Sequence, residues 1–334
     1  MKKIAQYIFS IGLTAIFAYL AFAEVEFSAL WQAILTVAPQ SIIAIVTITL
    51  MRIGLRAWRW QFMMRSFADH IGYVVTCLAV AVCYAANVIV PRSGDLLRAV
   101  LLGWSDRVPL EPMLGSVALE RIFDVLLLVI FAWGVFAFMM PGQIEVYPEL
   151  KWSIPLGIVG GGLLLGLMGL FAAGRFGLVL RCAAWISPRL EVLVAPRLSA
   201  FSQGMRSLQS PLDFAVIAGV SLVMHLSYAC VIYAGFWGLG LVENYGVGVE
   251  ASLLTVVFSA VAFFVPAPAG IGPYHFFFKE ALVVFYAVPP TEALACATVV
   301  HATYNLTYLV VGTGAAIAVL GRRWFQDRQG GYTG

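Results

Sequence analysis

Charged residues are scarce in this sequence. Only 11% of the 334 residues are Asp, Glu, Lys or Arg, whereas 62% are hydrophobic and the mean hydropathy is +0.93. Soluble globular domains carry about 25% charged residues, so this composition excludes an ordinary soluble domain. The net charge of +3 says little by itself, and nothing in the sequence suggests nucleic-acid recognition. The chain is predicted to be an all-α integral membrane protein.

Catalytic and metal-binding motifs are also lacking. The five cysteines are scattered, odd in number and without the spacing of metal ligands, so we interpret them as small buried hydrophobic residues. The sequence contains no nucleophile elbow, no phosphate-binding P-loop and no His-x-x-Glu-His motif. No cofactor or metal is expected, and the chain is not expected to be an enzyme.

Long apolar runs are what the sequence has instead. A membrane-spanning helix needs about 20 consecutive apolar residues. The runs that satisfy this requirement, or nearly do, are 4–23, 38–60, 113–140, 153–174, 212–238 and 294–320. The first run could alternatively be a signal peptide, because Ala21-Phe22-Ala23 resembles a cleavage site. It is long for a signal peptide, which favours a retained span.

Two further apolar stretches, 71–104 and 252–287, are each broken in the middle. The first is interrupted at Pro91–Asp95 and the second at Pro266–Pro273. Irregular backbone at membrane depth is tolerated only inside protein or beside a polar cavity. Paired breaks of this kind point to the binding site of a transporter.

The distribution of Lys and Arg predicts how these segments are oriented. Basic residues gather on the cytoplasmic side of membrane proteins, and here they occur at 2–3, 52–65, 175–206 and 322–328. With both termini cytoplasmic, 71–104 must enter and leave on the inner side and 252–287 on the outer side. Both stretches are therefore predicted to be re-entrant helical hairpins that approach from opposite faces.

The order span, span, hairpin, span occurs twice, in 1–140 and in 153–320, with opposite orientation. This pattern predicts an inverted-topology repeat. The span after each hairpin carries a polar pair at i, i+4, namely Glu120 with Asp124 and His301 with Asn305. The alternative is two unrelated hairpins in an eight-segment bundle.

The first hairpin tip is a candidate anion site. Arg92, Asp95 and Arg98 lie within seven residues, and Ser93 could cap the half-helix that follows it. The free N–H groups of such a half-helix and the guanidinium of Arg92 both suit phosphate or carboxylate. Alternatively, Arg92 or Arg98 only pairs with Asp95, Glu120 or Asp124 to hold the hairpin.

Glu120, Arg121 and Asp124 follow just inside the next span. In one interpretation Arg121 neutralises Asp95 or Asp124 locally. In the other, Glu120 binds a cationic group or takes up a proton, since burial favours the neutral form of a carboxylate. The sequence leaves both open.

The second tip has no charge, but Gly270 and Gly272 would let backbone approach a ligand closely, and Pro273 suits the start of a helix. His275 near this tip could titrate. The alternative is a tight turn that only packs. The cytoplasmic segment 175–211 mixes spaced arginines with apolar residues, as an amphipathic segment on an anionic leaflet would.

Three motifs occur in order along the chain: Asn87-x-x-x-Pro91-Arg92-x-Gly94-Asp95-x-x-Arg98, Glu120-Arg121-x-x-Asp124 and Pro266-x-Pro268-x-Gly270-x-Gly272. Together they resemble the membrane domain of lysylphosphatidylglycerol synthases, over about residues 5–320. That domain also occurs alone in flippase-like proteins of bacteria and archaea, which implies a cell (inner) membrane location. The resemblance implies lipid translocation, and not lysyl transfer. Two departures concern the head group: Ala269 replaces a glycine, and His275 stands near an expected acidic residue.

The leading hypothesis is a lipid translocase with a central polar site between two hairpins. Its cargo would be a phospholipid, glycolipid or polyprenyl- or hopanoid-type lipid with an anionic or phosphate head group. The substrate-binding residues would be Arg92, Ser93, Gly94, Asp95, Arg98, Glu120, Arg121, Asp124, Gly270, Gly272, His275, His301 and Asn305. Two alternatives remain: a membrane-embedded enzyme acting on a lipid phosphate or lipid-linked sugar, and a non-transporting scaffold for lipid-synthesis enzymes.

Overall fold

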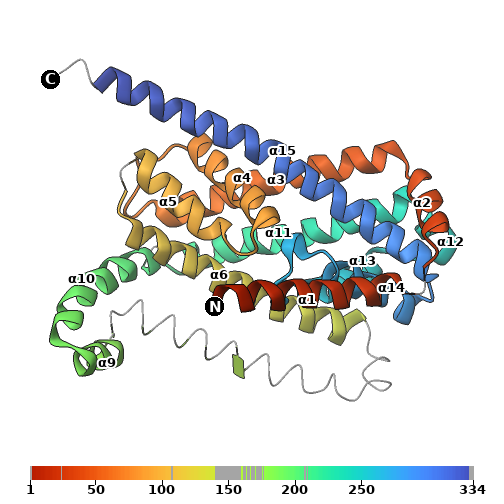
Figure 1. The fold of residues 1–334 in the computed structure, drawn as a ribbon, viewed down its shortest axis with the longest axis horizontal. Coiled ribbons are helices and arrows are strands. Elements are labelled where there is room, and N and C mark those ends of the chain that lie inside the picture. The colour runs from red at the N-terminus through yellow and green to blue at the C-terminus, as the bar shows by residue number, and fades with distance from the viewer. Residues whose placement is uncertain are drawn as a thin grey trace. The chain divides into compact units, whose positions relative to one another are not determined.

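The computed structural model describes residues 2–23, 25–106, 108–139, 175, 177–206, 208 and 210–330, together with residues 159, 160, 163, 166 and 170 (Figure 1). The expected span 153–174 and the loop before it therefore lie largely outside the described residues. Every regular element in the described part of the chain is helical, as the sequence predicts.

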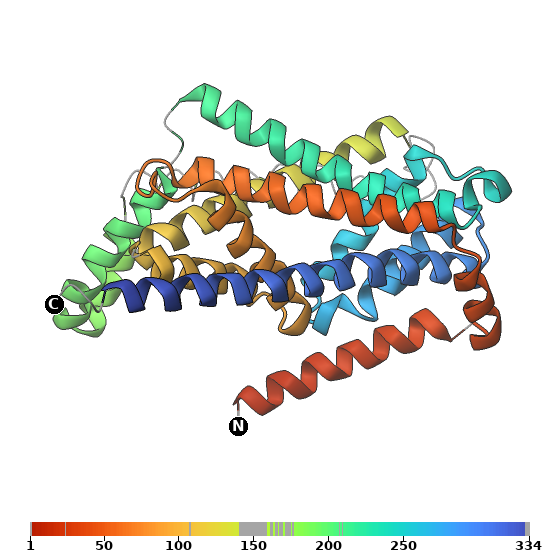
Figure 2. The same cartoon turned by 90° about the horizontal axis from the view of Figure 1, so that it is seen from above.

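The helices of the first part of the chain are α1 (Lys2–Phe22), α2 (Phe27–Leu35), α3 (Pro39–Met64), α4 (Tyr73–Ile89), α5 (Gly94–Asp106), α6 (Leu110–Gly134) and the π-helix η1 (Val135–Met139). Those of the second part are α9 (Gly177–Ile186), α10 (Pro188–Met205), α11 (Pro211–Gly238), α12 (Leu241–Tyr245), α13 (Val249–Val261), the short 3₁₀ turns η3 (Ala262–Phe264) and η4 (Pro268–Gly270), α14 (Pro273–Tyr286) and α15 (Pro290–Gly330). Figure 2 shows α15, in blue, as one uninterrupted helix.

Three helices in the described residues are long and apolar enough to cross a membrane: α3, α11 and residues Pro290–Gly321 of α15. A fourth crossing arises if Gly12–Phe22 and Phe27–Leu35 together form one broken span. These two segments meet at an angle of 81°. The sequence did not predict this bend or the short helix α2. Helix α6 covers the expected span 113–140 together with η1, and it carries Glu120, Arg121 and Asp124.

The chain divides into two compact units, each built from segments far apart in the sequence. Unit 1 comprises Met1–Ile53, Ala81–Gly94 and Met224–Ala315, and unit 2 comprises Gly54–Val80, Asp95–Val223 and Ala316–Gly334. Helices α3, α4, α11 and α15 contribute residues to both, and the first residue of α5, Gly94, belongs to unit 1 while the rest of α5 belongs to unit 2. The units cut across the expected repeats 1–140 and 153–320, and the inverted repeat stays a prediction.

Local sequence signals explain where many helices begin. Proline is the first residue of α3, α10, α11, α14 and α15, a position where its missing N–H and fixed φ cost nothing. Ser210 and Asp213 form a reciprocal capping pair at the start of α11. The Asp213 N–H donates to Ser210 Oγ and the Ser210 N–H donates to Asp213 Oδ2, both at 3.1 Å.

The break at Pro91–Asp95 is a tight turn between α4 and α5. The N–H of Gly94 donates to Asn87 Oδ1 at 2.8 Å, and a Cβ atom at position 94 would overlap the carbonyl of Cys83. The hydroxyl of Ser93 donates back to the carbonyl of Val90 at 2.8 Å, so it completes the end of α4. The expected capping role at the start of α5 is thus taken by Asn87.

The break at Pro266–Pro273 separates α13 from α14. The rings of Phe258 and Phe285 pack edge to face with centroids 5.3 Å apart, so the two helices lie against each other. The turn needs left-handed backbone at Gly270 (φ 75°) and Gly272 (φ 89°), and Ala269 also has a positive φ of 52°. The glycines supply this conformation without a steric cost, and Pro273 starts α14 as predicted.

Two glycines on α15 test how closely this helix packs in unit 1. A Cβ at Gly312 would overlap the Ala85 side chain and the Ala81 carbonyl, whereas a Cβ at Gly314 has nothing within 4 Å. Gly312→Ala should lower the free energy of unfolding by about 1–3 kcal/mol through overpacking. Gly314→Ala should leave it unchanged or raise it slightly. Thermal unfolding in detergent measures both, and equal melting temperatures would contradict the packing.

Candidate functional site

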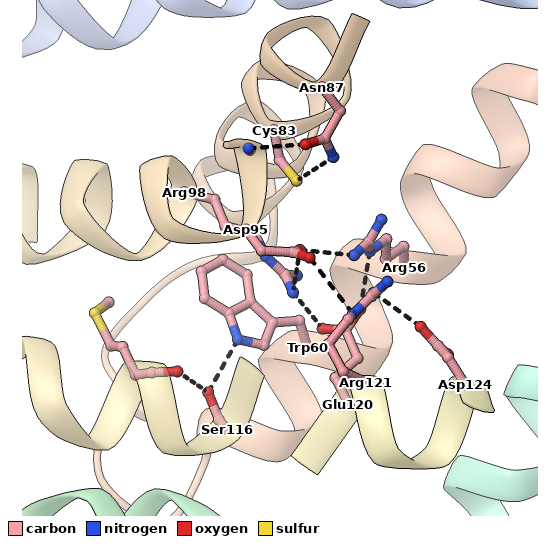
Figure 3. Close-up of polar contacts among 12 residues, drawn as sticks. Arg56, Trp60, Cys83, Asn87, Asp95, Arg98, Ser116, Glu120, Arg121 and Asp124 are labelled. Carbon is pink, nitrogen blue, oxygen red and sulfur yellow. Dashed lines mark hydrogen bonds and ion pairs between the residues drawn. The ribbon is translucent and has the colours of Figure 1, made fainter. Parts of the chain in front are cut away.

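Unit 2 contains a cluster of charged side chains centred on Glu120 (Figure 3). The Glu120 side chain is fully buried. Its Oε1 accepts hydrogen bonds from Arg56 Nε at 2.8 Å, Arg59 Nη2 at 2.9 Å and Arg121 Nη2 at 2.8 Å. Its Oε2 accepts one from Arg98 Nη2 at 2.7 Å. One carboxylate on α6 therefore gathers four guanidinium groups from α3, α5 and α6.

Two aspartates complete this cluster from either side. Asp95 Oδ1 lies 2.9 Å from Arg56 Nη2 and 3.1 Å from Arg98 Nη2. Asp124 Oδ1 lies 2.6 Å from Arg59 Nη1. Each aspartate side chain is 24% exposed. The arginines are thus bridged by carboxylates, as the ion-pairing interpretation of Arg98 and Arg121 expected.

Arg121 is the most accessible member of the cluster. Its side chain is 41% exposed, while those of Arg59, Arg98 and Glu120 are fully buried. It reaches all three carboxylates: Glu120 and Asp124 at 2.8 Å, and Asp95 at 3.5 Å. An incoming anion would therefore meet Arg121, flanked by the partly buried Asp95 and Asp124.

The seven charged residues do not balance. Four arginines (56, 59, 98 and 121) face three carboxylates (95, 120 and 124), which leaves one excess positive charge. Part of the buried charge is stabilised by neutral groups: Arg59 Nη1 donates to the Ser221 hydroxyl at 2.5 Å, and Arg98 lies 4.3 Å over the Trp60 ring. A charged group in a membrane interior is costly and usually functional, so this cluster is the candidate site.

Arg56 and Arg59 were predicted only to mark the inner end of the second span, and not as site residues. They are buried on α3 and paired with carboxylates, so they belong to the charged cluster. A signal for their role was present. Arg52, Arg56 and Arg59 are spaced i, i+4, i+7, which places all three on one face of a helix.

The second tip is bound to α15 within unit 1. His301 Nε2 lies 2.9 Å from the Ala269 carbonyl oxygen, and Asn305 Nδ2 donates to the His301 carbonyl at 3.0 Å. The expected pair His301 and Asn305 therefore holds the tip. Gly270 lies beside it, because a Cβ there would be 4.0 Å from His301 Nε2.

Gly272 and His275 have packing surroundings. A Cβ at Gly272 would come within 2.7 Å of the Thr14 carbonyl and 3.0 Å of the Ala18 nitrogen, so α1 passes directly over this glycine. His275 is 6% exposed, and its ring centroid lies 4.8 Å from that of His301. Its Nδ1 has no hydrogen-bond partner among the described residues. The structure thus places Gly272 against a helix, as in the packing alternative.

Arg92 connects the two tips. It adopts a left-handed φ of 64°, its side chain is exposed, and its Nη2 lies 3.4 Å from the carbonyl oxygen of Phe264 in η3. Both residues belong to unit 1. Arg92 at the first tip thus contacts the backbone just before the second tip, and a site between the tips stays a prediction.

Arg52, on the same helical face as Arg56 and Arg59, has different surroundings. It is 1% exposed and lies 3.3 Å over the ring of Tyr228, and its Nε has no hydrogen-bond acceptor among the described residues. A desolvated cation–π contact contributes about 2 kcal/mol, whereas desolvation of an ion costs several kcal/mol. The Tyr228 ring alone does not offset the burial of this charge.

Glu120→Gln tests whether the cluster depends on its central charge. The variant keeps the shape of the side chain but leaves four guanidiniums with two carboxylates, so the free energy of unfolding should fall by about 3–5 kcal/mol. Glu111→Gln is the control on the same helix. The Glu111 side chain is 39% exposed, and its ion pair with Arg197 is long at 4.0 Å, so the variant should change the free energy of unfolding by less than about 1 kcal/mol. Thermal unfolding in detergent would contradict the assignment if the two variants behaved alike.

Comparison with known proteins agrees with the sequence motifs. Residues 7–312 match the family model described as the lysylphosphatidylglycerol synthase TM region. A protein of Haloferax volcanii named Glycosyltransferase AglD is 22% identical over 311 residues, which cover 84% of this chain and 49% of that protein. The chain thus spans about half the length of this curated relative. With its apolar helices and a match over nearly its whole length, the chain is a multi-pass membrane protein that belongs to the lysylphosphatidylglycerol synthase TM region family.

Proposed function

We propose that the protein is a translocase that carries a lipid with an anionic or phosphate head group across the bilayer. The observation that supports this most directly is the charged cluster of unit 2. It concentrates four arginines and three carboxylates on helices that are otherwise apolar, and it has one excess positive charge. A net positive, partly accessible site in a membrane protein suits an anionic ligand.

The exposed side of the cluster suggests how a head group binds. The carboxylates of Asp95 and Asp124 form ion pairs with the guanidinium of Arg121 in the structure. A phosphate presents anionic oxygen acceptors of the same kind. In this proposal the phosphate replaces the aspartates on Arg121, while the buried Arg56, Arg59 and Arg98 stay with Glu120. Binding is then an exchange of acceptors, which avoids leaving a charge unpaired in the membrane.

The two breaks supply the route for the head group. The helices on either side of each break are short. Helices α4 and α5 have 17 and 13 residues, and helices α13 and α14 have 13 and 14. Each is shorter than the about 20 residues needed to cross a bilayer, which favours re-entrant hairpins. Arg92 would pass the phosphate along the tips, and the lipid tails would stay in the surrounding bilayer. His301 and Asn305 would contact the remainder of the head group.

The membrane context follows from the same proposal. We infer a location in the cell (inner) membrane with both termini cytoplasmic. Helices α9 and α10 would lie on the inner surface, since Trp185 is 90% exposed and Val192 76% exposed beside Arg189 and Arg197. An apolar face next to arginines is typical of a helix that lies on an anionic leaflet.

A second candidate function is chemistry on a lipid-linked sugar. It is favoured by the name of the relative AglD, a glycosyltransferase, and Asp95, Glu120 and Asp124 would be its acidic groups. These three carboxylates are bridged by arginines, which leaves them poorly placed as general acids or metal ligands. Product formation by purified protein in detergent, where there is no second compartment, would support this alternative over transport.

Arg92→Ala should slow translocation at least tenfold, because it removes the guanidinium at the tips without touching a buried ion pair. The measurement uses proteoliposomes with fluorescent phosphatidylglycerol, or a fluorescent polyprenyl phosphate sugar, and a quencher that reaches only the outer leaflet. Arg197→Ala is the control, since Arg197 is 56% exposed on α10 and should leave the rate unchanged.

The result is informative in either direction. Both variants should insert and melt like the parent protein, so a lower rate reports the step itself. A parent protein that moves none of the anionic reporters would overturn the translocase proposal and would favour a non-transporting scaffold for lipid-synthesis enzymes. Equal rates for the parent and Arg92→Ala would remove Arg92 from the route.

A further inference from the structure

Arg52 is a buried cation without a carboxylate partner among the described residues. Arg56 and Arg59, one and two turns further along α3, each contact two carboxylates. Arg52 instead lies over the ring of Tyr228, with its guanidinium carbon 3.3 Å from the ring centroid, and its Nε lacks an acceptor. A charge this deeply buried requires an anion or a set of acceptors, and the described protein groups do not supply them.

Tyr84, Tyr228 and Tyr308 each interact electrostatically with Arg52, and their hydroxyls can donate hydrogen bonds. Tyr308 is 5% exposed, and its hydroxyl has no hydrogen-bond partner among the described residues. Its ring stacks on that of Tyr84, with centroids 4.3 Å apart and planes 6° from parallel. These residues come from α3, α4, α11 and α15, and all belong to unit 1. Four helices thus bring a guanidinium and phenol groups together.

An aromatic and polar row on α15 connects these residues to the second tip. The ring of Tyr304 lies 5.8 Å from that of Tyr308 and 5.2 Å from that of His301. His301 in turn contacts the Ala269 carbonyl. Residues 301, 304 and 308 are spaced i, i+3, i+7, so they share one face of the helix. The row runs from the tip to the group around Arg52.

We propose that Arg52, Tyr228 and Tyr308 form a binding site for a phosphate oxyanion, in addition to the charged cluster of unit 2. A guanidinium fork and a phenol O–H both donate to phosphate oxygens, and the negative charge compensates Arg52. A neutral ligand would leave the cation uncompensated. The phosphate belongs to a lipid head group or is free inorganic phosphate. The lipid source rests on the proposed function, whereas binding itself does not require transport.

Counting the lipids bound to the purified full-length protein tests this site. Native mass spectrometry follows titrations with phosphatidylglycerol, with diacylglycerol (which lacks phosphate) and with inorganic phosphate alone. Arg52→Met should bind one fewer phosphatidylglycerol than the parent protein. The matched control, Arg65→Met, removes an arginine further along the chain whose side chain is 45% exposed and paired with Asp213, and it should bind the same number as the parent.

A milder variant keeps the test valid if Arg52→Met does not fold. Tyr308→Phe removes only one hydroxyl, and it should weaken phosphatidylglycerol binding about tenfold, as expected for a lost hydrogen bond to a charged group. Arg52→Lys keeps the charge but loses the planar fork, so its affinity should lie between those of the parent and Arg52→Met.

Each outcome has a defined meaning. An Arg52-dependent adduct with phosphatidylglycerol alone supports a lipid head group, and one with inorganic phosphate supports a free oxyanion. Arg52-dependent binding of diacylglycerol, or unchanged binding in the Arg52 and Tyr308 variants, overturns the site. Because the measurement has no second compartment, a parent protein that fails to translocate lipid would refute the proposed function and leave this result intact.

Discussion

The burial of Glu120 is the constraint on which the rest of the charged cluster depends. A lone carboxylate in an apolar interior is very unfavourable, and here it is compensated by guanidiniums from α3, α5 and α6. Three of those guanidiniums, from Arg56, Arg59 and Arg98, are themselves buried and also pair with Asp95 or Asp124. The requirement for charge compensation therefore fixes the rotation of three helices of unit 2 about their axes, where apolar packing alone would tolerate several arrangements.

Unit 1 is organised by different chemistry. The polar groups around the second tip are tyrosines, histidines and an asparagine, and His301 contacts the backbone of the tip at the Ala269 carbonyl. Neutral donors and acceptors can exchange partners at a lower cost than ion pairs in a medium of low polarity. The protein thus combines one rigid ionic group and one adaptable aromatic group, a combination suited to holding and releasing a charged ligand.

The all-helical class and several helix boundaries were predictable, because apolar runs and Pro or Gly breaks are local signals. The expected break at Pro91–Asp95 is the turn between α4 and α5, and Pro273 starts α14. The site was predictable only in part. Arg56 and Arg59 satisfy the pattern of cytoplasmic arginines, and only the helices that face α3 reveal that they are buried. The capping of α5 by Asn87 in place of Ser93 was also not predictable, since Asn87 lies on α4, seven residues before Gly94.

The position of α1 over Gly272 bears on the fate of the amino-terminal segment. Besides covering this glycine, α1 provides the Leu20 carbonyl that accepts a hydrogen bond at 3.2 Å from Lys279, whose side chain is 3% exposed. Removal of residues 1–23 by a leader peptidase would uncover the left-handed turn and take an acceptor from a buried ammonium group. Helix α1 is therefore part of the packing that holds the second tip.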